Sequence, residues 1–358
     1  MKATLPVVLL ATLLPFPGHA ARPVDEDPYG RALRLAPLVL QESCPPYLMR
    51  SPGASFIEAP IACDAFLSTA LVSLALENPE RTAEVLPVLD KLVEQGLSKT
   101  AKKAFAATGS TLVGGELLPR SVLYRGFLLL MLEGRERLQP GGPRAKVADA
   151  LAAALAADLE ASSLGYLPSF GVKQIWPCDQ SPAASALLLH ARRRNDETSR
   201  RAGEALRARL LADLRRRRGF PTAYSPSGKL LIATPRATTT AWTAAFLGIS
   251  SPEAGEAFAV DLFKRFCDRK AAFTACREWP RGVSRPPDSD SGPLIFGYAV
   301  GSSALALGAA QFHPAGDWDE GLLGTAGRYG LDSVLDPIRT MKLENAIYLW
   351  GRSVRSWV

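Results

Sequence analysis

The chain of 358 residues contains few of the residues that build metal or redox centres. It has three histidines, His19, His190 and His313, and its five cysteines include no CxxC pair. Zinc sites need several histidine or cysteine ligands at short spacing, so we expect no zinc site. The sequence also lacks the GxSxG, Walker and GxGxxG motifs of serine hydrolases and nucleotide-binding proteins. We therefore predict that the protein uses neither a metal nor another cofactor.

Long apolar runs are also scarce. The run at residues 5–16 follows a single lysine, contains two prolines, and leads into Gly18-His19-Ala20. It is too short to span a bilayer, and small residues at positions 18 and 20 suit a signal peptidase. A buried first helix is the alternative, but both prolines would then need an explanation. We predict cleavage after Ala20, export to the periplasm or beyond, and a single mature domain over 21–358 without a transmembrane segment.

Export makes disulfide bonds possible. Cys267 and Cys276 are close in sequence, and Cys44 and Cys63 flank one loop. These spacings predict the pairs Cys44–Cys63 and Cys267–Cys276, which would leave Cys178 as a free thiol. Reduction of all five cysteines stays open at this stage.

Positive charge is concentrated in one segment. The formal net charge is +7, and residues 192–218 hold eleven arginines against four acidic residues. Leucines at helical spacing in this segment predict an amphipathic helix with a solvated basic face. A surface that binds phosphate or membranes is an alternative. Few aromatic residues lie between the arginines, so we do not expect nucleic-acid binding.

Apolar periodicity and turn signals predict an all-α chain. The odd-numbered helices are amphipathic, whereas the even-numbered ones are rich in Ala, Leu, Ser and Gly, which is typical of buried helices. This alternation favours an (α/α)6 toroid of six helical hairpins over a less regular α-solenoid. The predicted helices are 27–41, 64–76, 80–105, 116–138, 144–162, 181–192, 195–218, 236–247, 252–272, 291–310, 317–330 and 341–351, with a small β-hairpin inserted at 219–235.

Aspartates stand where three of the buried helices are expected to begin. Asp64 follows Cys63, Asp179 follows Trp176-Pro177-Cys178, and Asp288 and Asp290 precede the tenth helix. In a toroid the inner helices run parallel, so these carboxylates would meet at one end. Each aspartate could also be an ordinary N-cap, which accepts from the first free N–H groups of its helix.

Carboxylates held together in a pocket can divide acid and base roles, as in glycoside hydrolysis. We expect Asp179 to cap its helix, which would lower its pKa and make it a base or an orienting group. Asp288 or Asp290 would then be the acid. Cys178 near a helix N-terminus is either a reactive thiol or a small buried residue. The candidate neighbours for binding a substrate are Asp64, Arg125, Tyr166, Trp176, Trp279 and Tyr298.

Two motifs carry a family resemblance. Trp176-Pro177-Cys178-Asp179 and the segment DSDSGP at 288–293 resemble segments of the linalool dehydratase/isomerase-like family. The resemblance covers the central and C-terminal two-thirds of the chain. It implies an α/α toroid and a cofactor-independent lyase or isomerase that adds and removes water through acid–base side chains, with Cys178 and Asp179 in the site.

Two classes of function follow from these patterns. The first is an acid–base enzyme, either hydratase-like or a glycan-active hydrolase, with a small-molecule or glycan ligand. The second is an exported binding or scaffold protein that uses the toroid alone. The enzyme requires that Cys178, Asp179, Asp288 and Asp290 line one pocket, which a structure can test.

Overall fold

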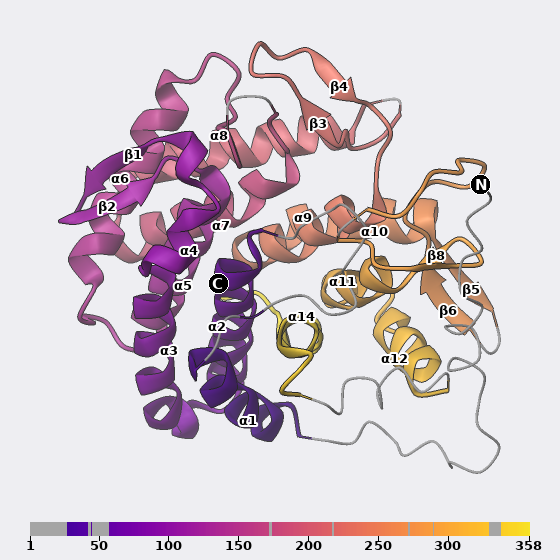
Figure 1. Ribbon diagram of the computed structural model, residues 1–358, viewed down its shortest axis with the longest axis horizontal. Coiled ribbons are helices and arrows are strands. Elements are labelled where there is room, and N and C mark those ends of the chain that lie inside the picture. The colour runs from indigo at the N-terminus through magenta and orange to yellow at the C-terminus, as the bar shows by residue number, and fades with distance from the viewer. Residues whose placement is uncertain are drawn as a thin grey trace, which may run out of the picture.

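The computed structural model describes residues 27–41, 44, 57–171, 174–216, 218–270, 273–288, 290–328 and 338–358. They form an α/α toroid, as predicted, with two concentric layers of helices (Figure 1). Each inner helix packs against the next, and the last packs against both its predecessor and the first, which closes the ring. The inner helices are α2 (Ala59–Glu77), α5 (Val122–Leu138), α7 (Ser181–Arg194), α9 (Ala237–Ser250), α11 (Val300–Ala310) and α14 (Lys342–Ser353).

Inner helices α2, α9 and α11 are largely apolar, as expected for helices that are enclosed by others. Helix α2 buries residues from Ala59 to Ala75, and α9 buries all but one of its residues. By length and composition α2 could cross a membrane, but 89% of its apolar window is buried inside the protein. The rings of Phe66, Phe127, Phe246 and Trp350 meet in the middle of the core, drawn from four inner helices.

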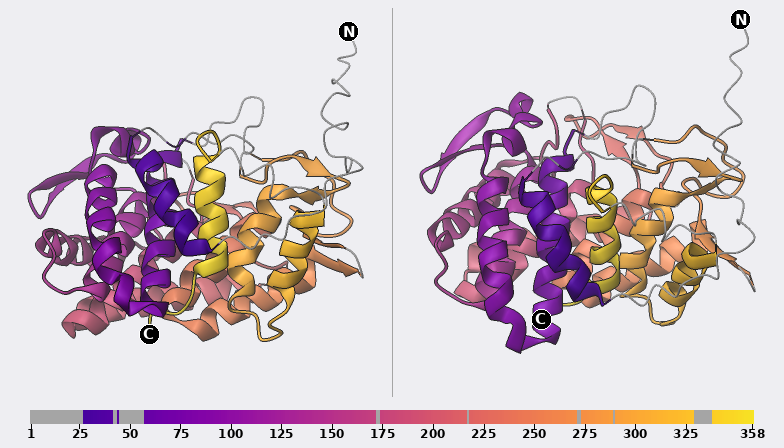
Figure 2. Two further views of the ribbon diagram at one scale, coloured as in Figure 1. Left: turned by 90° about the horizontal axis from the view of Figure 1, so that it is seen from below. Right: turned by 60° about the horizontal axis from the view of Figure 1, so that its bottom comes forward.

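The outer layer consists of amphipathic helices that cover the inner ring. Helix α3, for example, buries Val85, Leu89 and Leu92 and exposes the intervening polar residues. Seen from the side, inner and outer helices run across the thickness of the ring (Figure 2). The outer helices are α1 (Pro28–Gln41), α3 (Thr82–Gly96), α6 (Ala145–Ala161), α8 (Glu197–Leu214), α10 (Pro252–Phe266) and α12 (Trp318–Arg328), with a short α4 (Lys99–Lys103) beside α3.

The described residues form four antiparallel hairpins at the edge of the toroid, whereas the sequence predicted one. The predicted hairpin is formed by β3 (Ala223–Tyr224) and β4 (Leu230–Ile232). The others replace parts of predicted helices: 116–119 is a strand, 267–270 is a strand, and 291–299 contains a hairpin. They are β1 (Ser110–Val113) with β2 (Glu116–Pro119), β5 (Cys267–Lys270) with β6 (Phe273–Cys276), and β7 (Leu294–Ile295) with β8 (Tyr298–Ala299).

Both predicted disulfides are confirmed. Cys44 bonds Cys63, Cys267 bonds Cys276, and Cys178 is a buried free thiol. Two disulfides are typical of a protein that matures in an oxidising compartment. The predicted signal peptide, residues 1–20, lies outside the described residues and stays a prediction.

Candidate functional site

The N-terminal ends of four inner helices bring charged side chains together around Arg236. This arginine immediately precedes α9, is 2% exposed, and pairs with three carboxylates. Its Nε donates to Glu278, its Nη2 to Asp290, and its Nη1 lies 2.8 Å from an oxygen of Asp288. Burial alone would lower the pKa of Arg236, but the three carboxylates raise it above its ordinary value. The guanidinium therefore stays charged, and each of its three nitrogens contacts a carboxylate.

Glu278 joins this arginine to two inner helices. The carboxylate accepts from Thr238 Oγ1 at 2.9 Å, in the first turn of α9, and from Ser302 Oγ at 2.6 Å, in the first turn of α11. Its backbone carbonyl accepts from Ala237 N at 3.0 Å. Glu278 is fully buried, and each of its oxygens has a donor, which is what a buried carboxylate requires.

Asp179 lies at the mouth of α7 but does not cap it, which corrects the sequence prediction. The chain enters α7 through a 3-10 turn, η4 (Cys178–Gln180), so the N-cap position falls on Gln180. Burial is the main cause that raises the pKa of Asp179 to about 7; Ser169 and Cys178 oppose the shift, and the charge of Asp290 adds a smaller increase that is already part of this value. One carboxyl oxygen, Oδ2, is buried without a hydrogen-bond partner among the described residues. Asp179 can therefore gain or lose a proton near neutral pH.

Glu58 occupies the N-cap position of α2 without making a capping hydrogen bond. Burial raises its pKa to about 8, and the charges of Asp179, Asp290 and Asp288 contribute in that order. Each of these carboxyls is thus close enough to Glu58 to change its proton affinity. The site thus places Glu58 and Asp179, whose pKa values are raised to about 8 and about 7, with an arginine that pairs with three carboxylates.

Cys178 stands beside this cluster. Its Sγ donates to Asp179 Oδ1 at 3.5 Å. Burial raises the pKa of the thiol well above its usual range, and the charges of Asp179 and Asp290 raise it further, whereas Arg236 lowers it. A thiol in this setting keeps its proton, which favours the small buried residue over the reactive thiol of the two alternatives for Cys178.

Three of the residues predicted at the site lie elsewhere. Helix α2 begins five residues before Asp64, whose carboxylate accepts from Gln95 on the outer helix α3 at 3.1 Å. Arg125 pairs with Asp158 on outer helix α6 at 2.7 Å. Tyr166 donates to Asp213 on outer helix α8 at 2.9 Å. All three side chains reach the outer layer, away from Arg236.

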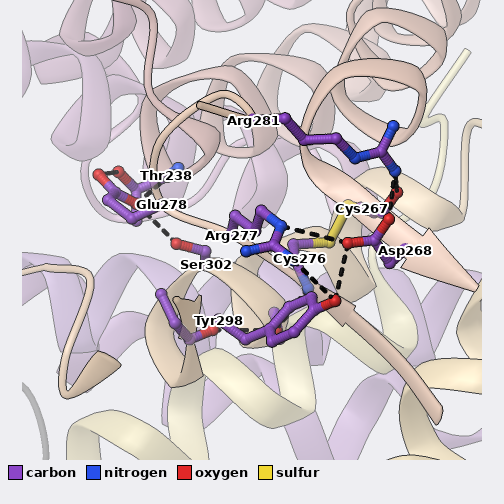
Figure 3. The surroundings of a disulfide bond; sticks show 11 residues. Thr238, Cys267, Asp268, Cys276, Arg277, Glu278, Arg281, Tyr298 and Ser302 are labelled. Carbon is purple, nitrogen blue, oxygen red and sulfur yellow. Dashed lines mark hydrogen bonds and ion pairs between the residues drawn. A yellow bond between two sulfur atoms is a disulfide. The ribbon is translucent and has the colours of Figure 1, made fainter. Parts of the chain in front are cut away.

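The remaining aromatic candidates have different neighbours. The Trp279 ring lies beside Arg236, 5.6 Å from its guanidinium carbon, and Arg285 is 5.4 Å from the same ring. Trp176 is half-buried and packs against the core. Tyr298 belongs to a separate cluster, where its hydroxyl donates to Asp268 at 2.8 Å. Figure 3 shows Asp268 on one side of the Cys267–Cys276 disulfide and Glu278 on the other.

Two hollows formed by described residues lie away from this cluster. One, of about 270 Å³, lies beside α3 and α5, and its Arg135 and Arg144 are paired with Asp90 and Glu94. The other, of about 260 Å³, lies between α6 and α8. Neither contains a residue of the Arg236 cluster, so the pocket predicted at the inner-helix mouths stays a prediction.

Sequence reasoning missed Glu58, Arg236 and Glu278. A signal for Glu58 was present, because Pro60 favours the first turn of a helix and so marks a start before Cys63. Arg236 follows Pro235 and is the N-cap of α9, within one residue of the predicted helix start, but an arginine gives no sign of its partners in the sequence. Glu278 lies in a loop two residues beyond a cysteine, and only the fold brings it to α9.

Comparisons with known proteins agree on the fold. No family model and no curated protein matches the chain. Unsaturated glucuronyl hydrolase from Bacillus sp. GL1 matches with a TM-score of 0.55 at 13% identity, over 91% of this chain and 97% of that one. An α-1,6-mannanase of Salegentibacter sp. HEL1_6 matches with 0.53 at 10%, over 92% and 99%. A family 76 α-mannanase of Bacteroides thetaiotaomicron matches with 0.54 at 8%, over 92% and 96%. These structures are α/α toroids of glycoside hydrolases, not of linalool dehydratase, so the resemblance holds for the toroid, and at this identity the likeness is one of fold.

Proposed function

We propose that this protein is a glycan-active hydrolase that works by general acid–base catalysis with two carboxyl groups and without a cofactor. The observation that carries the proposal is the pair Glu58 and Asp179, with pKa values raised to about 8 and about 7 at the mouths of two inner helices. Hydrolysis of a glycosidic bond needs one carboxylic acid and one carboxylate at the same pH. The fold of the matching hydrolases supports the substrate class.

The two roles follow from the order of the pKa values. Between about pH 7 and pH 8, Glu58 holds a proton while Asp179 is mostly ionised. Glu58 is therefore the acid that protonates the leaving oxygen as the C–O bond breaks, and Asp179 is the base that takes a proton from the attacking water. Asp288 and Asp290, our sequence candidates for the acid, pair with Arg236, and a carboxylate paired with a guanidinium serves better as a fixed charge than as a proton donor.

The test is hydrolysis of defined oligosaccharides by the wild type and two variants. The matching structures name heparin- and glycosaminoglycan-degrading glucuronyl hydrolases and α-1,6-mannanases, so unsaturated glucuronyl disaccharides and α-1,6-manno-oligosaccharides are the first substrates to try. Glu58→Gln and Asp179→Asn should each lower kcat by roughly 10²–10⁴-fold. Wild-type activity should be bell-shaped in pH with its maximum between about 7 and 8.

Asp268→Asn is the matched control, since Asp268 is also paired with arginines but lies outside the cluster. It should retain wild-type kcat. Full turnover by Asp179→Asn would remove this carboxyl from the mechanism. Saturable binding of a glycan by the wild type without turnover would support the binding protein instead.

A second candidate is a hydratase or dehydratase of the kind that the sequence motifs resemble. The observation that favours it is the hydrogen bond from Cys178 to Asp179, which joins a thiol to a carboxyl of neutral pKa. A terpenoid alcohol in the same assay separates the two. Conversion of the alcohol that Cys178→Ser abolishes would favour the hydratase, because the glycan mechanism makes no use of the thiol.

A further inference from the structure

We propose that Arg236 is a positioning residue: it holds Asp288 and Asp290 as fixed negative charges beside Glu58 and Asp179, and these charges keep a proton available on that pair. The inference deepens the proposed function, since it explains what readies the acid and the base. It concerns proton occupancy in the resting protein, however, and can be tested without any substrate.

The first step is the geometry of the arginine. A guanidinium is a rigid planar fork, so partners on Nε, Nη1 and Nη2 fix its plane. In this protein all three nitrogens face carboxylates, from Glu278, Asp288 and Asp290. Glu278 is itself held by Thr238 and Ser302, which ties the fork to the first turns of α9 and α11. The arginine therefore has one orientation, and it sets the positions of the two aspartates.

The second step is the packing of the segment that carries these aspartates. Ser291 Oγ accepts from Asp288 N at 2.9 Å, and Gly301 N in α11 donates to Ser291 O at 2.8 Å. A Cβ added to Gly301 would lie 2.3 Å from the carbonyl oxygen of Asp290. This close approach requires glycine at position 301. It allows the segment that carries Asp288 and Asp290 to pack against the start of α11. Asp290 is thus fixed from its backbone as well as from its carboxylate.

The third step is the charge balance around the working pair. Three carboxyl groups share one guanidinium, so Arg236 does not neutralise all of them when they are ionised. The charge of Asp290 acts on both Asp179 and Glu58, whereas that of Asp288 contributes to Glu58. Among the described residues, the groups that change the pKa of Asp179 are Ser169, Cys178 and Asp290, and the cation of the cluster, Arg236, is itself engaged by carboxylates. A fixed anion in this position opposes ionisation of a neighbouring carboxyl.

Cys178 supplies a direct readout. It is the one cysteine outside the two disulfides, and its Sγ–H points to Asp179. A thiol that donates to a carboxylate has a lower S–H stretching frequency than one that donates to a carboxylic acid. The infrared S–H band of the intact protein therefore titrates with Asp179, with a wild-type midpoint near pH 7. Cys178→Ser should remove the band, and Asp179→Asn should stop its titration.

The decisive comparison is Asp290→Asn against Asp268→Asn, followed through this band. Removing the Asp290 charge should lower the midpoint by roughly half a pH unit or more, while Asp288→Asn should shift it less. Asp268→Asn removes an arginine-paired aspartate from the other side of the disulfide and should leave the midpoint unchanged (Figure 3). Equal midpoints for Asp290→Asn and the wild type, or a shift to higher pH, would overturn the proposal.

The role of Arg236 itself is tested by a double-mutant cycle. Arg236→Lys keeps the charge but cannot bind three carboxylates as a fork. If Arg236 acts by holding Asp290, then Asp290→Asn should shift the midpoint much less in the Arg236→Lys background than in the wild type. Additive shifts would show that the arginine is not the positioning residue. If Arg236→Lys does not fold, the single variants still decide whether Asp290 tunes the pair.

Discussion

At the scale of single residues, the carboxyl group of Asp179 links the proposed acid–base role to folding stability. Its pKa in the folded protein is about 7, raised by burial, against an ordinary value near 4 in the unfolded chain. Below pH 4 both states hold the proton, and the carboxyl costs nothing. As the pH rises from 4 to 7 the unfolded state ionises first, so folding stability falls until the folded group also ionises. The cost is then complete, on the order of 4 kcal/mol as an upper limit.

Because the pKa of Asp179 is raised on folding, Asp179→Asn, which removes the ionisation, should become more stable than the wild type as the pH rises. Thermal or urea unfolding should show little difference at pH 4 and a growing advantage for Asp179→Asn up to about pH 8. Asp268 gives the opposite control, because hydrogen bonds and ion pairs to Tyr298, Arg281 and Arg277 outweigh its burial and lower its pKa. Asp268→Asn should therefore lose stability relative to the wild type above pH 4. Parallel curves for Asp179→Asn and the wild type would show that its carboxyl is not buried as described.

At the scale of helices and strands, apolar composition predicted which segments form the inner layer, because a helix enclosed on all sides needs no polar face. Apolar composition did not predict the short strands. The hairpins at β5–β6 and β7–β8 use strands of only two to four residues, too short for an alternating pattern to emerge. The predicted start of α7 was wrong for a related reason. A 3-10 turn precedes the helix, so Asp179 is not its N-cap, and its pKa is raised where capping was expected to lower it.

The same limit explains which part of the site could be foreseen. Asp179, Asp288 and Asp290 were found because each stands before a buried helix, and the toroid brings these helix ends together. Glu278 follows the β5–β6 hairpin, and Arg236 follows a loop. No local pattern in the sequence predicts that the chain brings these two residues together. Asp64 shows the converse error, since an aspartate near a helix start can lie inside the helix and face the outer layer.

Helix packing yields a prediction at the same scale. Helices α9 and α10 cross at two glycines, and a Cβ on Gly255 would lie 2.6 Å from the Cα of Gly248. Gly255→Ala should therefore force the helices apart and cost about 1–3 kcal/mol of folding stability. Gly324 in α12 has open space around it, so Gly324→Ala should instead stabilise by up to about 1 kcal/mol through helix propensity. Urea unfolding of the two variants measures both effects, and a destabilised Gly324→Ala together with a neutral Gly255→Ala would contradict the packing.

At the scale of the whole molecule, the toroid depends on closing the ring between its first and last helices. Helix α14 packs against both α2 and α11, and the chain then continues to Trp357. The indole Nε1 of Trp357 donates to Ser73 of α2 at 3.1 Å, its backbone N donates to Ile249 of α9 at 2.8 Å, and a Cβ on Gly134 of α5 would lie 3.0 Å from its ring. Trp357, near the end of the sequence, thus joins three inner helices: its buried side chain contacts α2 and α5, and its backbone bonds α9.

This arrangement predicts that Trp357 contributes more to stability than its position near the C-terminus suggests. Trp357→Ala removes a fully enclosed ring and should cost about 3–5 kcal/mol of unfolding free energy, the usual loss for a buried tryptophan. Trp357→Phe keeps most of the apolar contact and loses the hydrogen bond to Ser73, so it should cost less. Arg355→Ala, which removes a half-exposed ion pair with Glu77, is the control and should cost under about 1 kcal/mol. Urea unfolding should rank the variants in that order. If Trp357→Ala unfolded at the wild-type midpoint, the C-terminal segment would not close the ring. Its contacts with α2, α5 and α9 would then contribute nothing to the free energy of unfolding.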